Sequence, residues 1–253
     1  SPTEELKKTF KNIDKLNTYD GIKLLLEDQK NSISAIKKVM NDISNCIDQM
    51  FMRLNRSDTG RLIYAGAGTS GRIAIQDGVE LLPTFGWPEN RLEYIMAGGE
   101  KAVFKSVEFA EDDVINSIKI IEKLNINFND VVIGVAASGN TPFTCKIIEK
   151  AKAYSAMTIA ITNNPNGTIL NFADNKIILE TNGEIIAGST RMKAGTSQKI
   201  CLNLISTMLM VKMGKVKNGL MTEMVPTNSK LIERNQEAIN TYNQLFVALK
   251  KKG

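Results

Sequence analysis

Hydrophobic residues recur along this chain with two different spacings. Between residues 21 and 55 they recur every three or four positions, which predicts one or two long helices. Helical patterns also separate five later apolar runs, and a last long one covers 193–213. The alternation indicates an α/β fold: a doubly wound parallel five-stranded sheet of flavodoxin-like type, flanked by helices. The predicted strands lie at 61–65, 92–96, 131–136, 157–162 and 175–180.

The same patterns divide the chain into three parts. We expect an N-terminal helical segment over 1–55, a central α/β domain over 56–215 and a C-terminal helical segment over 216–253 that packs on the same unit. Within the central domain, Pro83 is expected to end the helix that starts near Ser70, because proline lacks the backbone donor a helix needs. Ligands of such folds bind beyond the carboxyl ends of the strands, so the loops there are the candidate site.

Composition narrows the chemistry. The 253 residues contain no histidine, which excludes serine–histidine and cysteine–histidine catalysis and histidine metal sites. Acid–base chemistry therefore falls to Glu, Asp, Lys or Tyr. The three cysteines lack the spacing of a zinc site and favour reduced thiols in a cytoplasm. The polar first residues and the polar interruptions of the apolar stretch 200–213 predict neither a signal peptide nor a membrane span.

Three loops consist largely of Gly, Ser, Thr and Ala, and they lie at 66–72, 137–141 and 188–196. The first two follow predicted strands, and all three lead into helical patterns. Backbone N–H groups and small hydroxyls in this arrangement bind phosphate. The first loop also matches the glycine pattern of dinucleotide-binding folds, but no acidic residue ends the second strand to hold a ribose. A phosphorylated small molecule is therefore the better prediction.

Charged residues near these loops are candidates for recognition and catalysis. The formal charge of +5 suits an anionic ligand, whereas 6% aromatic content without an Arg-rich run argues against nucleic acid. Arg72, Arg191 and Lys193 stand near helix starts, where the helix dipole disfavours a cation unless an anion binds there. Glu80 and Glu111 are the candidate acid–base groups, although by position alone a helical glutamate such as Glu80 is more often a solvated surface residue, and Glu111 suits a helix cap. Hydroxyls of the third loop suit helix capping as well as ligand contact: Ser189, Thr190 and Thr196.

An ordered set of motifs is similar to that of one known family. The motifs lie at 61–72, 83–86, 97–99, 110–113, 136–139, 188–196 and 226–228. Together they resemble the N-acetylmuramic acid 6-phosphate etherase family, which has the sugar isomerase (SIS) phosphosugar-binding fold. The resemblance spans most of the chain. Departures occur at Asn140, where the family usually has arginine, and at 81–83, where it has Cys-Pro-Pro in place of Leu-Leu-Pro.

The resemblance implies a reaction and a set of site residues. Glu80 and Glu111 fall on the family's acid–base residues, with Glu80 expected to protonate the leaving lactyl oxygen and Glu111 to remove the C2 proton. The implied reaction cleaves the C3 lactyl ether of a phosphorylated amino sugar, giving N-acetylglucosamine 6-phosphate and D-lactate, without a metal or redox cofactor. A cytoplasmic homodimer that serves amino-sugar recycling is implied as well. The residues expected to contact the phosphate and sugar are Gly68, Thr69, Ser70, Arg72, Ser138, Gly139, Asn140, Thr141, Ser189, Arg191 and Lys193.

Two other functions use the same fold and remain alternatives. Regulatory proteins of this fold bind sugar phosphates to control a kinase, and they share the third-loop motif without needing both glutamates. Aldose–ketose isomerases also remove the C2 proton, but they exchange protons between C1 and C2 and keep the C3 substituent. Because fold alone does not decide among these functions, release of D-lactate is the discriminating observation.

Overall fold

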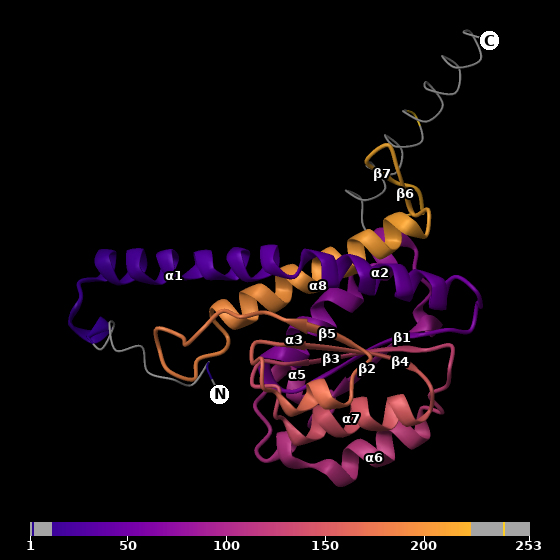
Figure 1. The fold of residues 1–253 in the computed structure, drawn as a ribbon, viewed down its shortest axis with the longest axis horizontal. Helices are drawn as coiled ribbons and strands as arrows, with labels where there is room; N and C mark the ends of the chain where they lie inside the picture. Colours follow the sequence, from indigo (N-terminus) through magenta and orange to yellow (C-terminus); the bar gives the residue numbers. More distant parts are fainter. Residues whose placement is uncertain (1, 3–11, 224–239, 241–253) are drawn as a thin grey trace.

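The computed structural model describes residues 2, 12–223 and 240. Its centre is a parallel five-stranded sheet in the order β2-β1-β3-β4-β5 (Figure 1). This order and the all-parallel pairing confirm the predicted fold class. The strands are β1 (Leu62–Gly66), β2 (Leu92–Met96), β3 (Val131–Ala136), β4 (Met157–Thr162) and β5 (Asn175–Ile178).

Helices cover both faces of the sheet, as Figure 1 shows. Successive strand residues point to opposite faces, so Leu62 and Tyr64 join one apolar cluster whereas Ile63 and Ala65 join the other. On the first face lie α1 (Thr18–Lys38), α2 (Met40–Leu54), α3 (Gly68–Val79) and α8 (Lys193–Lys212). On the second lie α6 (Val114–Lys123) and α7 (Pro142–Ala153). Shorter helices complete the order: η2 (Ile13–Lys15), α4 (Leu81–Phe85), η3 (Glu89–Arg91), α5 (Lys101–Phe104), η4 (Ala110–Asp112) and η5 (Thr168–Asn171).

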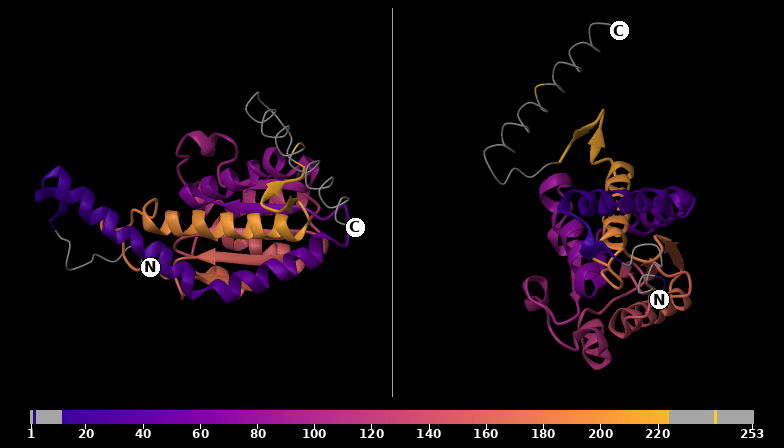
Figure 2. Two further views of the ribbon diagram at one scale, coloured as in Figure 1. Left: turned by 90° about the horizontal axis from the view of Figure 1, so that it is seen from above. Right: turned by 90° about the vertical axis from the view of Figure 1, so that its left-hand side faces the viewer.

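The predicted N-terminal helical region forms two helices that meet at Val39. Asn17 caps α1 by accepting a hydrogen bond from the backbone N–H of Asp20 at 2.9 Å. The second half of α1 and most of α2 bury their apolar residues against the sheet and α8. The first half of α1 extends beyond the sheet (Figures 1 and 2), and its Tyr19 side chain is 75% exposed.

Two local predictions are wrong. Pro83 does not end a helix over 70–82, because α3 already ends at Val79 and Pro83 lies in the first turn of α4. A first-turn residue has no intrahelical acceptor for its N–H, so proline costs no hydrogen bond there. Gly86, with φ +64°, ends α4 instead. After the second strand, the pattern through Val103, Phe104 and Val107 also predicts a longer helix than the single turn α5, which ends at Phe104.

The C-terminal segment, expected to be helical from residue 216, begins with a β-hairpin in the residues that the structure describes. Residues 216–221 form an antiparallel hairpin of β6 (Val216–Lys217) and β7 (Leu220–Met221). Asn218 and Gly219 both have positive φ, the requirement of a tight hairpin turn, and Asn-Gly is the sequence signal for it. Residues 224–239 and 241–253, which include the motif at 226–228, lie outside the described residues. Over the part that the structure describes, no helix is both long and apolar enough to cross a bilayer.

Candidate functional site

A small cavity lies beyond the carboxyl ends of β1 and β3. Its volume is about 160 Å³. The three loops rich in small residues all border it, and among the described residues Glu111 in η4 supplies the only lining carboxylate. The described residues that line it are Ala67, Thr69, Ser70, Glu111, Ala136, Ala137, Ser138, Thr141, Gly188 and Thr190.

Two helices begin at this cavity. Thr69 and Ser70 belong to the first turn of α3, and Thr141 is the N-cap residue of α7. Neither helix start has a side-chain cap. The free N–H groups of a first helical turn and the positive end of the helix dipole favour an anion. The local structure therefore suits a phosphate bound by neutral donors.

Glycines with left-handed backbones shape two of the loops. Gly68 has φ +53° and starts α3, while Gly139 has φ +68° in the second loop. A Cβ on Gly139 would stand 2.7 Å from the Cα of Gly167, so only glycine lets the second loop pack on the turn before η5. Neither glycine lines the cavity itself, but each sets the path of a loop that does.

Glu111 reaches the first loop from a neighbouring segment. Its Oε1 lies 3.0 Å from the position that a Cβ on Gly68 would occupy. The helix cap that sequence alone could have assigned to Glu111 is made by Asp113, whose side chain accepts from the N–H of Asn116 at 2.9 Å. Phe109, just before η4, has a left-handed backbone with φ +57°. The turn leaves the Glu111 carboxylate at the cavity.

Glu80 lies elsewhere in the same protomer. It is exposed, follows the last residue of α3 and does not line the cavity. The 12 residues of α3 span about 18 Å, and the helix returns the chain towards the start of β2. Glu80 therefore stands at the opposite end of the sheet from Glu111. The expected pair of carboxylates does not meet within one copy of the chain.

Three expected ligand contacts have structural partners instead. Arg72 donates from Nε to the carbonyl of Ala102 at 2.9 Å, so its charge holds the last turn of α5. Asn140 accepts at Oδ1 from the N–H and the hydroxyl of Thr168 at 2.9 and 3.0 Å, which caps η5. Lys193 is fully buried and is ion-paired, away from the cavity. Among the described residues, the donors that line the cavity are therefore neutral, and the two cations Arg72 and Lys193 are held by other parts of the protein.

The third loop contributes through residues that sequence reasoning weighed lightly. Gly188 and Thr190 line the cavity, whereas Ser189 and Arg191, their neighbours, do not. Thr196 does not cap α8, because its hydroxyl donates to the carbonyl of Met192 at 3.0 Å. The run of small residues at 188–190 was the available signal, but which of them faces the cavity depends on the fold of the loop.

The N-terminus of α8 is capped from inside the protein by Glu184. Its Oε1 accepts from the N–H of Ala194 at 2.9 Å. Burial raises the pKa of the Glu184 carboxyl, and the N–H groups of Ala194 and Lys193 oppose that shift. The sequence gives no sign of this role, because the known capping motifs lie next to the first residue of a helix and Glu184 precedes Lys193 by nine residues.

Comparisons with known proteins agree with this fold. A family model for the SIS domain matches residues 104–210, and one for the glucokinase regulatory protein N-terminal SIS domain matches residues 39–152. Among solved structures, the Vibrio vulnificus NanR protein complexed with ManNAc-6P is 12% identical with a TM-score of 0.56, covering 90% of this chain and 70% of that one. Phosphoheptose isomerase GmhA from Neisseria gonorrhoeae is 14% identical with a TM-score of 0.53, covering 73% and 93%. At such identities the likeness shows the fold alone.

Curated relatives are much more similar. An N-acetylmuramic acid 6-phosphate etherase of Mycoplasma mycoides subsp. mycoides is 43% identical over 232 residues, which are 92% of this chain and 76% of the relative. Another, of Deinococcus radiodurans, is 39% identical over 237 residues, or 94% of this chain and 77% of the relative. By this identity over most of both chains, and with an SIS domain at its centre, the chain belongs to the N-acetylmuramic acid 6-phosphate etherase family.

Proposed function

We propose that this protein is a carbon–oxygen lyase that cleaves the C3 lactyl ether of N-acetylmuramic acid 6-phosphate. The products are N-acetylglucosamine 6-phosphate and D-lactate. The observation that supports this best is the Glu111 carboxylate at a cavity where two uncapped helices begin. Because the three cysteines of the chain are free and buried, we place the reaction in a reducing cytoplasm.

The helix starts at α3 and α7 would hold the sugar phosphate. Ser70, Ser138 and Thr141 add hydroxyls at the cavity, and the backbone N–H groups of the first turn of α3 complete the donors. A phosphate held in this way is fixed by dipoles and hydrogen bonds rather than by a cation. We keep Thr69, Ser189 and Arg191 as further contacts of the bound sugar.

Glu111 would serve as the base. Ring opening exposes a C1 aldehyde that acidifies the C2 proton, and the Glu111 carboxylate takes that proton. The electron pair of the C2–H bond forms a C2–C3 double bond while the C3–O bond breaks, and an acid protonates the leaving lactyl oxygen. Water then adds across the double bond, with its hydroxyl at C3 and a proton returned to C2.

The acid in this scheme is Glu80, and its position requires a second copy of the chain. Glu80 stands at the opposite end of α3 from the cavity of its own protomer. A cavity of about 160 Å³ is also smaller than the 300 to 1,000 Å³ of ordinary ligand pockets, so one protomer encloses only part of the substrate. We propose a homodimer in which each copy supplies Glu80 to the site of the other.

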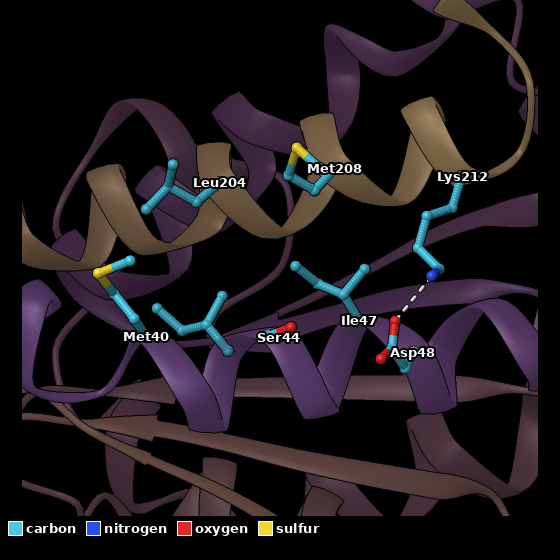
Figure 3. Close-up of a pocket in the computed structure, with 8 residues that line it drawn as sticks. Met40, Ser44, Ile47, Asp48, Leu204, Met208 and Lys212 are labelled. Atoms are coloured by element: carbon cyan, nitrogen blue, oxygen red, sulfur yellow. Dashed lines mark ion pairs between the residues drawn. The ribbon is translucent and has the colours of Figure 1, made fainter.

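The first face of the molecule has a surface suited to this dimer. Figure 3 shows an apolar groove between α2 and α8, in which Ile47 faces Leu204 and Met208 across the groove. Met208 is 46% exposed although it belongs to a long helix whose other side is core. The ion pair between Lys212 and Asp48, at 2.8 Å, closes one end. A two-fold related copy would cover these side chains, as isologous interfaces do.

Incubation of the purified protein with N-acetylmuramic acid 6-phosphate tests the reaction. We expect D-lactate in an amount equal to N-acetylglucosamine 6-phosphate. Glu111→Gln should abolish lactate release and keep phosphosugar binding, while Asp112→Asn, the same change one residue along, should stay active. Absence of lactate from the wild-type protein would refute the etherase activity.

Mixed dimers test the shared site. Glu80→Gln and Glu111→Gln should each be inactive alone. After the two variants are mixed and allowed to exchange subunits, up to one site in each mixed dimer would hold both wild-type glutamates, so lactate release should return. If mixing restores nothing although subunits exchange, Glu80 does not act across the dimer.

One observation favours a second function. Residues 39–152 match the N-terminal SIS domain of a regulatory protein, which fits binding of a sugar phosphate without catalysis. Such a protein would bind N-acetylglucosamine 6-phosphate in calorimetry but release no lactate, and the Glu111→Gln variant would behave like the wild type.

A further inference from the structure

Lys193, expected in the ligand site, is instead the centre of a buried charge cluster at the start of α8. Its Nζ lies 2.9 Å from each carboxylate oxygen of Asp28 in α1 and 2.6 Å from the carbonyl oxygen of Gly183. The Lys193 side chain is completely buried, and that of Asp28 is only 8% exposed. A charge is stable in such a place only when it is paired and hydrogen-bonded, as it is here.

The same cluster holds both ends of the third loop. Gly183 and Glu184 precede the loop, and Lys193 and Ala194 belong to its last part, where α8 starts. Lys193 binds the Gly183 carbonyl through its side chain, and Glu184 accepts from the N–H of Ala194 at 2.9 Å and of Lys193 at 3.4 Å. Ser32 of α1 donates to the carbonyl of Lys193 at 2.9 Å. Helix α1 therefore fastens the loop at its base.

Backbone hydrogen bonds between residues close in sequence fold the loop itself. The N–H of Thr190 donates to Gly188 at 2.9 Å, and that of Gly195 donates to Thr190 at 2.8 Å. Gly188 and Thr190 are the loop residues that line the cavity. Their position thus depends on where residues 183 and 193 are held.

Stability alone is a weak reason for this cluster. Removing two charges from water costs several kcal/mol per ion, and well-packed apolar residues of similar volume often stabilise a protein as much as a buried ion pair. What apolar residues could not supply is a donor to the Gly183 carbonyl. Because the Lys193 ammonium group binds both the Asp28 carboxylate and the Gly183 carbonyl, it fixes the distance between the two ends of the loop.

We propose that Asp28, Lys193 and Glu184 are positioning residues that hold the third loop against the phosphosugar site. They act through Gly188 and Thr190, so α1 sets the affinity of a site that it does not line. The inference rests on the proposed function for the nature of the ligand, but the ordering of the loop can be measured without any ligand.

Two variants and a control separate positioning from stability. Asp28→Asn removes the charge that pairs with Lys193. The double change Asp28→Leu with Lys193→Met replaces the pair by apolar side chains and removes the donor to Gly183. Glu27→Gln alters the neighbouring carboxylate, which lies on the surface and pairs with Lys30. For each we would measure the melting temperature, the calorimetric Kd of N-acetylglucosamine 6-phosphate and hydrogen exchange across residues 184–192.

Asp28→Asn should raise the Kd at least tenfold and speed the exchange of the Thr190 amide, while Glu27→Gln changes neither. The double variant should recover much of the melting temperature that Asp28→Asn loses and still bind the phosphosugar at least tenfold more weakly. Where lactate release is measurable, KM should rise by the same factor with kcat within about threefold. A double variant with the wild-type Kd and the wild-type exchange rate would overturn the proposal.

Failure of the proposed function gives a different result. A wild-type protein that releases no lactate refutes the etherase activity, whereas the exchange rates of loop 184–192 in the free protein still decide whether the cluster orders the loop. Unchanged exchange in a folded Asp28→Asn protein would overturn the inference even if the wild type is an active etherase.

Discussion

The carboxylate of Glu111 lies against the position that a side chain on Gly68 would take. Its Oε1 lies 3.0 Å from the ideal Cβ position at residue 68, where φ is +53°. Glycine is thus favoured for two independent reasons: its backbone is left-handed, and a side chain there would crowd the proposed base. The start of α3 and the tip of η4, which are 43 residues apart in sequence (111 less 68), form one site through this contact.

Gly68→Ala should therefore lower kcat/KM for lactate release at least tenfold. The left-handed backbone costs an alanine about 1 to 2 kcal/mol, and the new methyl group displaces the Glu111 carboxylate. Steady-state kinetics together with a thermal melt would show the two effects. Gly21→Ala is the matched control, since nothing lies within 4 Å of its Cβ position and alanine in a helix gains about 0.5 to 1 kcal/mol. Full activity of Gly68→Ala would mean that the contact does not position the base.

Ser70→Ala should raise KM about tenfold or more and leave kcat within a few-fold. A hydrogen bond to a charged group contributes about 1.5 to 3 kcal/mol, and a group that binds substrate and transition state equally affects KM rather than kcat. The calorimetric Kd of N-acetylglucosamine 6-phosphate should change by the same factor. Ser34→Ala, which removes an exposed hydroxyl of α1, should change neither value. An unchanged KM in Ser70→Ala would remove this hydroxyl from the phosphate site.

Arg72→Met should destabilise the protein without weakening phosphate binding much. Its guanidinium donates to the carbonyls of Ala102, Val103 and Lys105, and these lose a charged donor in the variant. The expected loss is about 1 to 3 kcal/mol in the free energy of unfolding. Urea unfolding would measure it. A rise of more than tenfold in the Kd of the phosphosugar, with little loss of stability, would instead show that Arg72 turns to the ligand.

Asp77→Asn should raise the melting temperature at pH 7.5 and lose this advantage by pH 4. Burial raises the pKa of the Asp77 carboxyl above its ordinary value of 3.8, and hydrogen bonds from Tyr64, Ser206 and Asn203 oppose the shift. Since the folded protein binds this proton more tightly than the unfolded chain does, ionised Asp77 lowers stability at neutral pH. The loss is relieved as the pH falls through the raised pKa towards 3.8. The asparagine keeps acceptors for Asn203 and Ser206 and donates to Tyr64.

Melting curves of both proteins at the two pH values would test this. Asp58→Asn, the same change at an exposed position, is the control. A melting temperature of Asp77→Asn below the wild type at pH 7.5 would show that the three hydrogen bonds outweigh the burial of the charge.

Much of the fold could be predicted because it depends on local patterns. Residues 131–136 carry no polar side chain and residues 157–162 are apolar except for two β-branched threonines, and both are strands with those bounds. The prediction from Pro83 was wrong because proline destabilises a helix only where its missing N–H would have made an intrahelical hydrogen bond. In the first turn of α4 no such hydrogen bond is possible. The Asn218-Gly219 dipeptide by itself predicts a hairpin turn, but the C-terminal segment was expected to be helical and this turn was not predicted.

The sequence by itself determined the sheet, the three loops of small residues and their place beyond the strands, since apolar runs and glycine-rich turns act over a few neighbouring residues. Only the tertiary structure decided which polar groups those loops meet. Arg72 and Lys193 looked alike as cations beside a helix start, yet one binds carbonyls of α5 and the other an aspartate 165 positions away. A long side chain is placed by whichever buried partner it can reach, and that partner comes near only when distant segments pack together.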